Sequence, residues 1–360
     1  MVFIHDYFPS IMHRYAMKYV DILKVNNIKY EIVNCHQPDF WDKLKTAELL
    51  IFYVGTDDIH LQQIKSILNV INQQTSLKCF PNYESSWHLD DKVSQYYLLK
   101  SHNLPVVDCR IYWDKDLALD FVNKTPYPVI FKLKRGAGSL NVVKVDNHIL
   151  GLKLVNAMFG KGITAGTVPG IKKSVIYNSD IKRVVSNTMG RVLAELGLRN
   201  KPYHSLMKER GYVLFQEFLP DNAHDTRVTI IGNRAFAFRR FNRPNDFRSS
   251  GSGLIDYDST KIDLSIVQTA FQISQELGFQ TMSYDFLLDK NGKHKIIEMC
   301  HLFADWAVYK CPGYWDEELI WHEGHFWPQY CELINLLGRD DLQQPEFEVY
   351  MGRENSVSLK

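Results

Sequence analysis

The sequence lacks any apolar run approaching the roughly 20 residues that a membrane-spanning helix needs, so we expect no membrane segment and no membrane partner. It also lacks a charge imbalance, because 42 Lys and Arg residues against 41 Asp and Glu residues leave a formal net charge of +1. No large basic surface therefore argues for a nucleic-acid partner. The first ten residues, MVFIHDYFPS, lack the basic and then apolar regions of a signal peptide, so we interpret them as a first buried strand and expect a cytoplasmic protein.

The sequence also lacks paired cysteines, internal repeats and low-complexity segments. Its six cysteines are far apart and none forms a CxxC motif, so we expect reduced thiols rather than a disulfide framework. The length of 360 residues exceeds that of one ordinary single-core domain and predicts two or three packed subdomains.

The first part of the chain alternates predicted strands with helical segments. Residues 2–7, 29–35 and 49–54 favour strands, while residues 10–26 and 57–74 have helical periodicity. This pattern predicts an open α/β unit with a parallel sheet, whose ligands bind at the carboxyl ends of the strands. The residues expected there are His5, Asp6, Tyr7 and Gly55, either as substrate contacts or as ordinary loop residues.

The later segments mix both element types, so the fold class is mixed α/β. A helix begins after the capping residue Asp90 or Asp91 and ends before Pro105, and residues 127–145 read as strand, glycine-rich turn, strand. Residues 151–211 are the least readable part, with a glycine-rich basic loop and a predicted helix over 179–196. Strands dominate from Tyr212, a helix covers about 263–278, and a hairpin with an Asn-Gly turn follows.

Four groups of residues are candidates for a functional site. Lys132 lies in an apolar strand just before Gly136, Gly138 and Ser139, where glycines let backbone N–H groups approach a phosphate; a plain hairpin with a solvated lysine is the alternative. The glycines match neither a Walker loop nor a Rossmann fingerprint, because no GxxxxGK[ST] is present and a strand follows.

The second group ends a strand. Gln216 and Glu217 are followed by Leu219, and a segment leaving a sheet with free backbone groups can pair with a purine. Asp225 and Arg227 alternate on the next strand and so share a face. An ordinary strand end with surface charges is the alternative interpretation.

The third and fourth groups are an arginine cluster and a pair of carboxylates. Arg239, Arg240, Arg243 and Arg248 precede the flexible stretch that begins with Ser249 and Ser250, which favours an anion site over a solvated surface loop.

Counting from the Asn-Gly turn places Asp285 and Glu298 near the same level of the hairpin. Paired carboxylates repel unless a cation or proton intervenes, and Mg²⁺ prefers carboxylates together with nucleotide phosphates.

The order of these elements resembles the ATP-grasp superfamily over roughly residues 85–305, in particular its branch of ribosomal-protein glutamate ligases and glutathione synthetases. The resemblance implies an N-terminal α/β domain over 1–88, two grasp lobes over 89–212 and 213–345, and a tail over 346–360. It implies ATP with Mg²⁺ or Mn²⁺ as cofactors. Small-molecule acid and amine substrates (an amino acid, peptide or sugar acid) and a homodimer are the partners we expect.

The resemblance also assigns roles to individual residues. Lys92 would be a phosphate-binding lysine, because DDKVSQYYLLKSHNLPVV is similar to the family's Asp-Lys helix. Lys132 would be the family's second lysine, which lies on a strand before the mobile glycine-rich loop, because YPVIFKLKRGAGS resembles that segment. VLFQEFL resembles the linker between the two grasp lobes, where Glu217 and Leu219 would flank the adenine and Gln216 is a further cofactor-binding candidate. Asp225 falls where the family has a ribose-binding acid. NDFRSSG resembles the glutamate-ligase motif in which Arg248 would bind phosphate or the acyl phosphate.

Asp285 and Glu298 match the magnesium carboxylates of the family, but the expected Glu-x-Asn reads Glu298-Met299-Cys300. A thiol is a poor ligand for hard Mg²⁺, so Cys300 departs from the pattern. Zinc binding by Glu298, Cys300 and His301 is disfavoured, because His301 points to the other face of the strand.

The implied activity is that of a carboxylate–amine ligase acting through an acyl phosphate. A kinase that phosphorylates a hydroxyl and a nucleotide-binding protein without turnover are the two alternatives. The stretch CPGYWDEELIWHEG departs from the ligases named above, and the sequence assigns it no role.

Overall fold

The computed structural model describes residues 1–6, 13–136, 139, 141–164, 168 and 208–346. Tyr7, Gly138, the predicted helix over 179–196 and nearly all of the predicted tail therefore lie outside the described residues. The chain forms two compact units, one comprising Met1–Leu89, Tyr97–Val106 and Leu219–Lys360, and the other Asp90–Tyr96 and Val107–Phe218. We call them unit 1 and unit 2.

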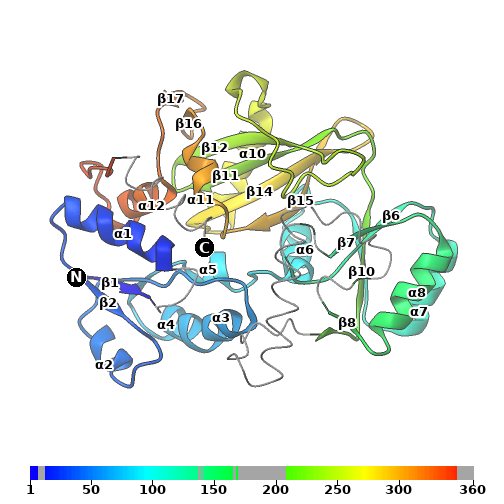
Figure 1. The fold of residues 1–360 in the computed structure, drawn as a ribbon, viewed down its shortest axis with the longest axis horizontal. Coiled ribbons are helices and arrows are strands. Elements are labelled where there is room, and N and C mark those ends of the chain that lie inside the picture. The colour runs from blue at the N-terminus through cyan, green and yellow to red at the C-terminus, as the bar shows by residue number, and fades with distance from the viewer. Residues whose placement is uncertain (7–12, 137–138, 140, 165–167, 169–207, 347–360) are drawn as a thin grey trace, which may run out of the picture. The chain divides into compact units, whose positions relative to one another are not determined.

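Unit 1 begins with the predicted parallel sheet, in the strand order β2-β1-β3-β4 (Figure 1). Its strands are β1 (Val2–His5), β2 (Tyr30–Val33), β3 (Leu49–Ile51) and β4 (Lys78–Phe80). Its helices are α1 (His13–Val25), α2 (Phe40–Leu44), α3 (Asp58–Gln63), α4 (Asn69–Gln74) and α5 (Tyr83–Ser86), with a π-helical turn over Ile64–Leu68 between α3 and α4. The helical periodicity of residues 57–74 is thus confirmed, with Asp57 capping α3 through the backbone N–H of His60.

The second part of unit 1 is a seven-stranded sheet in the order β15-β14-β11-β12-β16-β17, with β13 also paired to β12. Its strands are β11 (His224–Ile231), β12 (Arg234–Phe241), β13 (Ile255–Asp256), β14 (Thr281–Leu288), β15 (His294–Cys300), β16 (Gly313–Trp315) and β17 (Trp321–Glu323). Its helices are α10 (Leu264–Glu276), α11 (Asp305–Tyr309) and α12 (Pro328–Leu337), with a 3-10 turn over Ser259–Lys261.

Helices cover both faces of this sheet. On one face Ser274 of α10 hydrogen-bonds the hydroxyl of Tyr284 on β14 at 2.7 Å. On the other face Phe236 and Phe238 pack in one cluster with residues of α11 and α12. Because side chains alternate along a strand, Asp285 points to the face opposite Tyr284.

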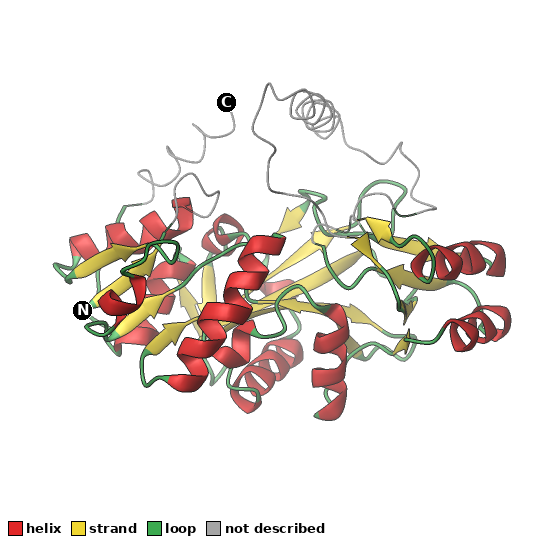
Figure 2. Cartoon of the chain, turned by 90° about the horizontal axis from the view of Figure 1, so that it is seen from below, coloured by secondary structure: helices red, strands yellow, loops and turns green. Residues whose placement is uncertain are grey.

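Unit 2 is a four-stranded antiparallel sheet with two helices. Its strand order is β5-β10-β6-β7, with β5 (Cys109–Tyr112), β6 (Val129–Lys132), β7 (Val142–Val145) and β10 (Val213–Glu217). Helices α7 (Lys115–Lys124) and α8 (His148–Met158) lie side by side, and Phe121 of α7 packs on Phe215 of β10 on one face of the sheet (Figures 1 and 2). A separate two-stranded pair joins β8 (Ile163–Thr164) to β9 (Lys208–Glu209).

Helix α6 (Lys92–Ser101) crosses the boundary between the two units. The carboxylate of Asp91 accepts from the backbone N–H groups of Val93 at 3.1 Å and Ser94 at 3.0 Å, so Asp91 is the predicted cap. Asn103 adopts a φ of 56° just beyond the helix, where the sequence predicts its end.

The segment that the sequence left without a role builds part of unit 1. CPGYWDEELIWHEG forms β16 and β17, and α12 follows it. Near these elements the ammonium of Lys18 on α1 lies 2.8 Å from Asp305 and 3.7 Å from the centre of the Trp327 ring. Gln329 donates to the same carboxylate at 2.9 Å. A buried lysine is costly without such partners, so these contacts join α1 to the C-terminal helices of unit 1.

A second buried contact joins the same helices. Tyr19 of α1 donates a hydrogen bond to the carboxyl group of Glu332 on α12. Burial raises the pKa of Glu332 to about 8, so this side chain is largely a neutral acid at pH 7.

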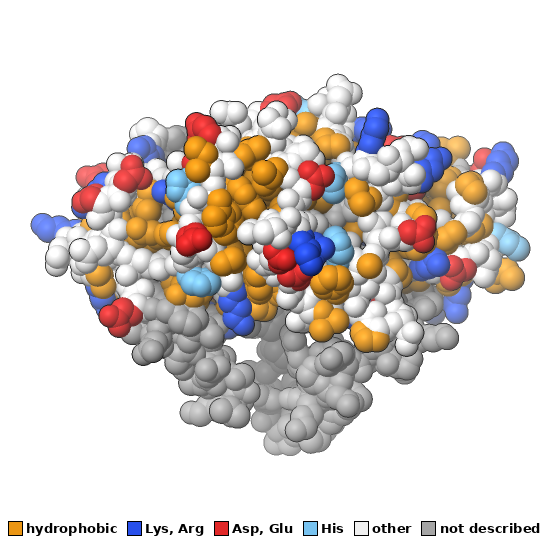
Figure 3. All heavy atoms as spheres, turned by 90° about the horizontal axis from the view of Figure 1, so that it is seen from above, with side chains coloured by type: hydrophobic (Ala, Val, Ile, Leu, Met, Phe, Trp, Pro, Cys, Tyr) orange, Lys and Arg blue, Asp and Glu red, His pale blue; other side chains and the backbone are white. Residues whose placement is uncertain are grey.

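All six cysteines are free thiols, as expected. Within the described residues, no helix is long and apolar enough to cross a membrane. The face drawn in Figure 3 shows charged side chains of both signs scattered between hydrophobic ones.

We predict that His301 makes the fold acid-sensitive. This buried imidazole hydrogen-bonds the backbone carbonyl of Ser85 at 2.8 Å, and burial, followed by the nearby His88, lowers its pKa to about 3. Because the unfolded chain binds the proton from about pH 6.5 downward and the folded chain does not, the free energy of unfolding falls as the pH drops from about 6.5 towards 3, by about 1.4 kcal/mol per pH unit.

Urea denaturation between pH 7.5 and 4.5 checks this expectation. His301→Gln should lose that part of the pH slope while keeping a donor for Ser85. Equal slopes in the two proteins would show that His301 does not carry the effect.

Candidate functional site

Lys132 and Gln216 lie on the same face of the unit 2 sheet. In the antiparallel register Lys132 pairs with Leu214, and Gln216 pairs with Ile130. The alternating residues of the same two strands, Phe131 and Phe215, pack as a ring pair on the other face, where α7 contributes Phe121. Lys132 and Gln216 therefore face away from the helices, with 6% and 7% of their surface exposed.

The glycine-rich turn joins β6 to β7 as predicted. Gly136 has a φ of 109°, which residues with a Cβ rarely adopt, and a Cβ there would lie 2.2 Å from the side-chain nitrogen of Asn141. A larger residue would therefore be strained and would displace the Asn141 amide. Lys92 reaches this turn, since its ammonium donates to the carbonyl of Gly136 at 2.8 Å. The structure thus brings Lys92 and the start of the glycine-rich loop together, and Ser139 follows with a φ of 60°.

Residues 216–219 leave the sheet at the end of β10. The exposed Glu217 donates its backbone N–H to Asp108 at 2.9 Å, and the amide of Gln216 contacts Cys109. Leu219 is buried and begins the next segment of unit 1. Their role beside an adenine remains a prediction.

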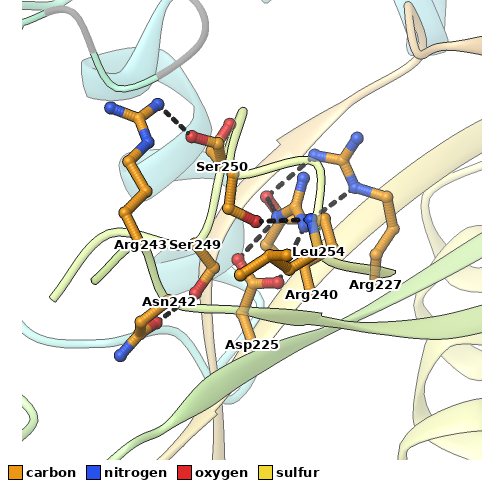
Figure 4. Close-up of polar contacts among 10 residues, drawn as sticks. Asp225, Arg227, Arg240, Asn242, Arg243, Ser249, Ser250 and Leu254 are labelled. Atoms are coloured by element: carbon orange, nitrogen blue, oxygen red, sulfur yellow. Dashed lines mark hydrogen bonds and ion pairs between the residues drawn. The ribbon is translucent and has the colours of Figure 1, made fainter. Parts of the chain in front are cut away.

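The centre of the unit 1 site is a cluster of four buried or half-buried charges on β11, β12 and β14 (Figure 4). The guanidinium of Arg227 donates to both oxygens of Asp285, at 2.7 and 2.9 Å. Arg240 donates to both oxygens of Asp225, at 2.8 and 2.6 Å, and lies 2.6 Å from Asp285. Asp285 is therefore held between two guanidinium groups.

The pKa values of the two acids differ because of these partners. Burial acts against ionisation of Asp285, but Arg227 and Arg240 outweigh it and hold the pKa of this carboxyl well below its usual range. Burial raises the pKa of Asp225 above its ordinary value, although Arg240 opposes the effect. Asp285 is thus the more firmly ionised of the two acids.

Glu298 lies directly opposite Asp285 in the β14–β15 ladder, which confirms the level predicted from the Asn-Gly turn. The register then shifts between Asp285 and Phe286, so a bulge adjoins the pair. Two carboxylates opposite each other suit a Mg²⁺ ion that takes its other ligands from phosphate and water. Among the described residues no group of three His, Cys, Asp or Glu side chains forms a complete metal site.

The other predicted arginines have partners within unit 1. Arg248 pairs with Asp246 at 2.7 Å, and Arg239 pairs with Asp256. Arg243 donates to the backbone carbonyl of Ser250 at 2.5 Å. An external anion that binds one of these guanidinium groups would therefore have to replace the acceptor that the group already contacts.

The serines and the first histidine have structural contacts too. Ser249 is buried and shares a hydrogen bond of 2.6 Å with Asn242 (Figure 4). His5 ends β1 as expected, and its ring stacks on Phe52 with centroids 4.3 Å apart. Burial and then the nearby His36 lower the pKa of His5 to about 4, so this imidazole is neutral at pH 7.

In the β14–β15 ladder Glu298 and Cys300 pair with Asp285 and Ser283, and Met299 between them pairs with Tyr284, so Met299 points to the opposite face. His301 follows the end of β15 and is buried. Cys300 is half-buried, and its sulfur accepts the backbone N–H of Leu302 at 3.3 Å.

Two partnerships were not predicted. The sequence placed Arg227 on the same face as Asp225, but its pairing with Asp285 depends on a strand 58 residues further on. Glu209 accepts backbone N–H groups at the start of the glycine-rich loop, and no local pattern marks that contact.

No protein-family model matches the chain. A tRNA pseudouridine synthase D of Helicobacter acinonychis (strain Sheeba) is 25% identical over 199 residues, which is 52% of this chain and 50% of that protein. The chain thus spans about half the length of this curated relative.

Solved structures agree over much more of the chain. N5-carboxyaminoimidazole synthetase from Staphylococcus aureus matches with a TM-score of 0.56 and 12% identity, over 95% of this chain and 78% of that one. Biotin carboxylase from Campylobacter jejuni matches with 0.54 and 11%, over 96% and 72%. The macrocyclase MdnC from Microcystis aeruginosa MRC, bound to a precursor peptide, matches with 0.51 and 10%, over 94% and 99%. The chain has the ATP-grasp fold, as the resemblance implied.

We predict that Arg240 is the main electrostatic support of the site. Arg240→Met would leave two buried carboxylates without their shared cation and should lower the free energy of unfolding by about 3–5 kcal/mol. Arg240→Lys keeps the charge but not the paired donors, so it should lower the free energy of unfolding by less than Arg240→Met does.

Arg239→Met is the matched control, because Arg239 on the same strand pairs with the more exposed Asp256 and should cost only about 0–1 kcal/mol. Denaturant unfolding at pH 7 measures all three variants. Equal losses at the two positions would contradict a special role for the buried cluster.

Proposed function

We propose that this chain is an ATP-dependent carboxylate–amine ligase that forms an amide bond through an acyl phosphate. The ATP-grasp fold supports this proposal. The observation that carries it is the placement of Asp285 opposite Glu298 in the β14–β15 ladder, with Arg227 and Arg240 at Asp285. Paired carboxylates beside cationic side chains suit the polyphosphate of a nucleotide and an anionic acyl group.

The reaction needs charge neutralisation and positioning more than covalent help from the protein. The substrate carboxylate would attack the terminal phosphorus of ATP, giving an acyl phosphate and ADP. The amine would then attack the acyl carbon, release phosphate and lose a proton. The ammonium groups of Lys92 and Lys132 and the guanidinium of Arg248 would neutralise phosphate oxygens.

The remaining predicted residues would hold the nucleotide. Gln216, Glu217 and Leu219 would contact the adenine, and Gly136, Gly138 and Ser139 would approach the phosphates. Asp225 would bind the ribose with lone pairs that Arg240 leaves available, because a carboxylate can accept several hydrogen bonds.

Asp285 and Glu298 would hold Mg²⁺ or Mn²⁺. When bound, the ion would supply charge neutralisation at the phosphates. Asp285 would exchange guanidinium contacts for the ion without a proton transfer, since its carboxyl is already ionised. Arg227, freed in this exchange, would remain beside the site as a cation.

The acid and the amine are proposed only as classes: an amino acid, a peptide or a sugar acid. Arg239, Arg240, Ser249, Ser250, His5 and Tyr7 are the proposed substrate contacts. A homodimer and a cytoplasmic location also remain proposals. An ATPase screen over pairs of acids and amines, read by product mass, would identify the substrates.

We predict that turnover depends on Lys132 and Glu298. In the screen, ADP should form only with both an acid and an amine, and Lys132→Met and Glu298→Gln should each lower kcat by roughly 10²–10³ because they remove charge stabilisation at the phosphates. Lys124→Met and Glu323→Gln are matched exposed controls that should leave turnover unchanged.

Unchanged turnover in Lys132→Met and Glu298→Gln would overturn the site assignment. A phosphorylated product formed without any amine would instead indicate a kinase. ATP binding without ADP release across the whole screen would indicate a nucleotide-binding protein without turnover.

We predict that Cys300 weakens the metal site. Cys300 shares the face of Glu298, and Cys300→Asn would present a hard amide oxygen in place of sulfur. The apparent Mg²⁺ affinity should rise by roughly tenfold, about 1.4 kcal/mol. Metal titration of nucleotide binding measures the change, with Cys300→Ala as a control that adds no ligand. No tightening with asparagine would show that Cys300 only packs beside the site.

A further inference from the structure

The first residues of the glycine-rich loop, Lys134 to Gly136, are held by contacts from residues outside these three. We call these three residues the stem. The backbone N–H of Lys134 donates to the hydroxyl of Tyr212 at 2.6 Å and to Glu209 at 3.2 Å. The next N–H, of Arg135, donates to the other oxygen of Glu209 at 3.1 Å. The carboxylate of Glu209 thus spans two consecutive peptide groups.

A second carboxylate completes the row. The N–H of Gly136 donates to Asp90 at 2.9 Å, so three successive backbone donors of the stem all meet carboxylate oxygens. Consecutive N–H groups form a site that favours anions. In the stem this anion site is filled by side chains of the chain itself.

The carbonyl groups of the stem are occupied as well. The carbonyl of Lys134 accepts the backbone N–H of Lys92 at 3.0 Å, and that of Arg135 accepts the side-chain amide of Asn141 at 2.9 Å. The carbonyl of Gly136 accepts the ammonium of Lys92 at 2.8 Å. All six backbone polar groups of the stem therefore have partners outside it, which fixes its position.

Glu209 is itself held in place. It lies on β9, which pairs with β8 through Ile163, and it accepts a hydrogen bond from the hydroxyl of Tyr212. Burial, and then the charge of Glu209, raise the pKa of Tyr212 well above its usual value, so this phenol keeps the proton that it donates. A backbone carbonyl also confines the neighbouring turn, since a Cβ on Gly162 would lie 2.8 Å from the carbonyl oxygen of Glu209.

We propose that Glu209 is a positioning residue for the nucleotide, because its carboxylate fixes the stem from which the glycine-rich loop starts. The inference rests on the proposed function, in which that loop and Lys92 approach the phosphates. Because Glu209 and Asp90 fill the three backbone N–H donors of the stem, those donors do not bind phosphate. The stem serves as a fixed base, and Gly136 would lie near the phosphates without donating to them. The stem holds the ammonium of Lys92 at Gly136, where a phosphate oxygen can replace the carbonyl as its acceptor.

The test compares Glu209→Ala and Glu209→Gln with the unaltered full-length chain. Hydrogen–deuterium exchange of peptides containing residues 134–136, without nucleotide, reports the stem directly. The alanine variant should exchange there at least roughly tenfold faster, because charge-assisted hydrogen bonds are lost. The glutamine variant should exchange at an intermediate rate, because its single amide oxygen can accept only some of the hydrogen bonds that two carboxylate oxygens accept. The Kd for ATP should rise by roughly tenfold in the alanine variant.

Lys208→Gln is the matched control, an exposed change on the same strand that should alter neither quantity. Unchanged exchange in a folded Glu209→Ala protein would overturn the proposal. Faster exchange with an unchanged Kd for ATP would overturn it too, because Glu209 would then be only structural. If the unaltered chain does not bind ATP, the proposed function fails, while the exchange comparison still decides whether Glu209 holds the stem.

Discussion

The candidate site of unit 1 depends on one ion cluster, in which the carboxylate of Asp285 lies between the guanidinium groups of Arg227 and Arg240. A carboxylate that is only 3% exposed cannot stay charged in a sheet without such partners. Both arginines come from strands adjacent in the sheet, so the cluster also requires the register of β11, β12 and β14. The charges of the site can therefore pair only while these three strands keep their register.

The pairing of charges in this cluster would determine which contacts must change if a nucleotide binds. When all four are ionised, the two arginines and two aspartates of the cluster balance one another in charge. A metal ion bound by Asp285 would release guanidinium donors at the moment when phosphate oxygens arrive to accept them. Exchange of partners within a neutral cluster avoids a stage in which a buried charge is left alone.

Features that depend on local sequence could be predicted, and long-range partners could not. The Asn-Gly turn sets the level of Asp285 and Glu298 because a short hairpin loop fixes the register of its strands. The helix cap at Asp91 follows from residues within one turn. The pairing of Arg227 with Asp285 and the contact of Glu209 with the stem join segments more than fifty residues apart, and no periodicity encodes them.

The two units satisfy backbone and side-chain charges in different ways. In unit 1 the four charges of the cluster formed by Asp225, Arg227, Arg240 and Asp285 pair with each other, so their partners can be exchanged for a ligand. In unit 2 the carboxylates of Glu209 and Asp90 pair with backbone N–H groups, which cannot leave without moving the chain. The first arrangement suits residues that bind, and the second suits residues that hold a loop in place. Glu209 therefore belongs with the scaffold of the proposed nucleotide site, even though consecutive backbone N–H donors would ordinarily suggest a phosphate ligand.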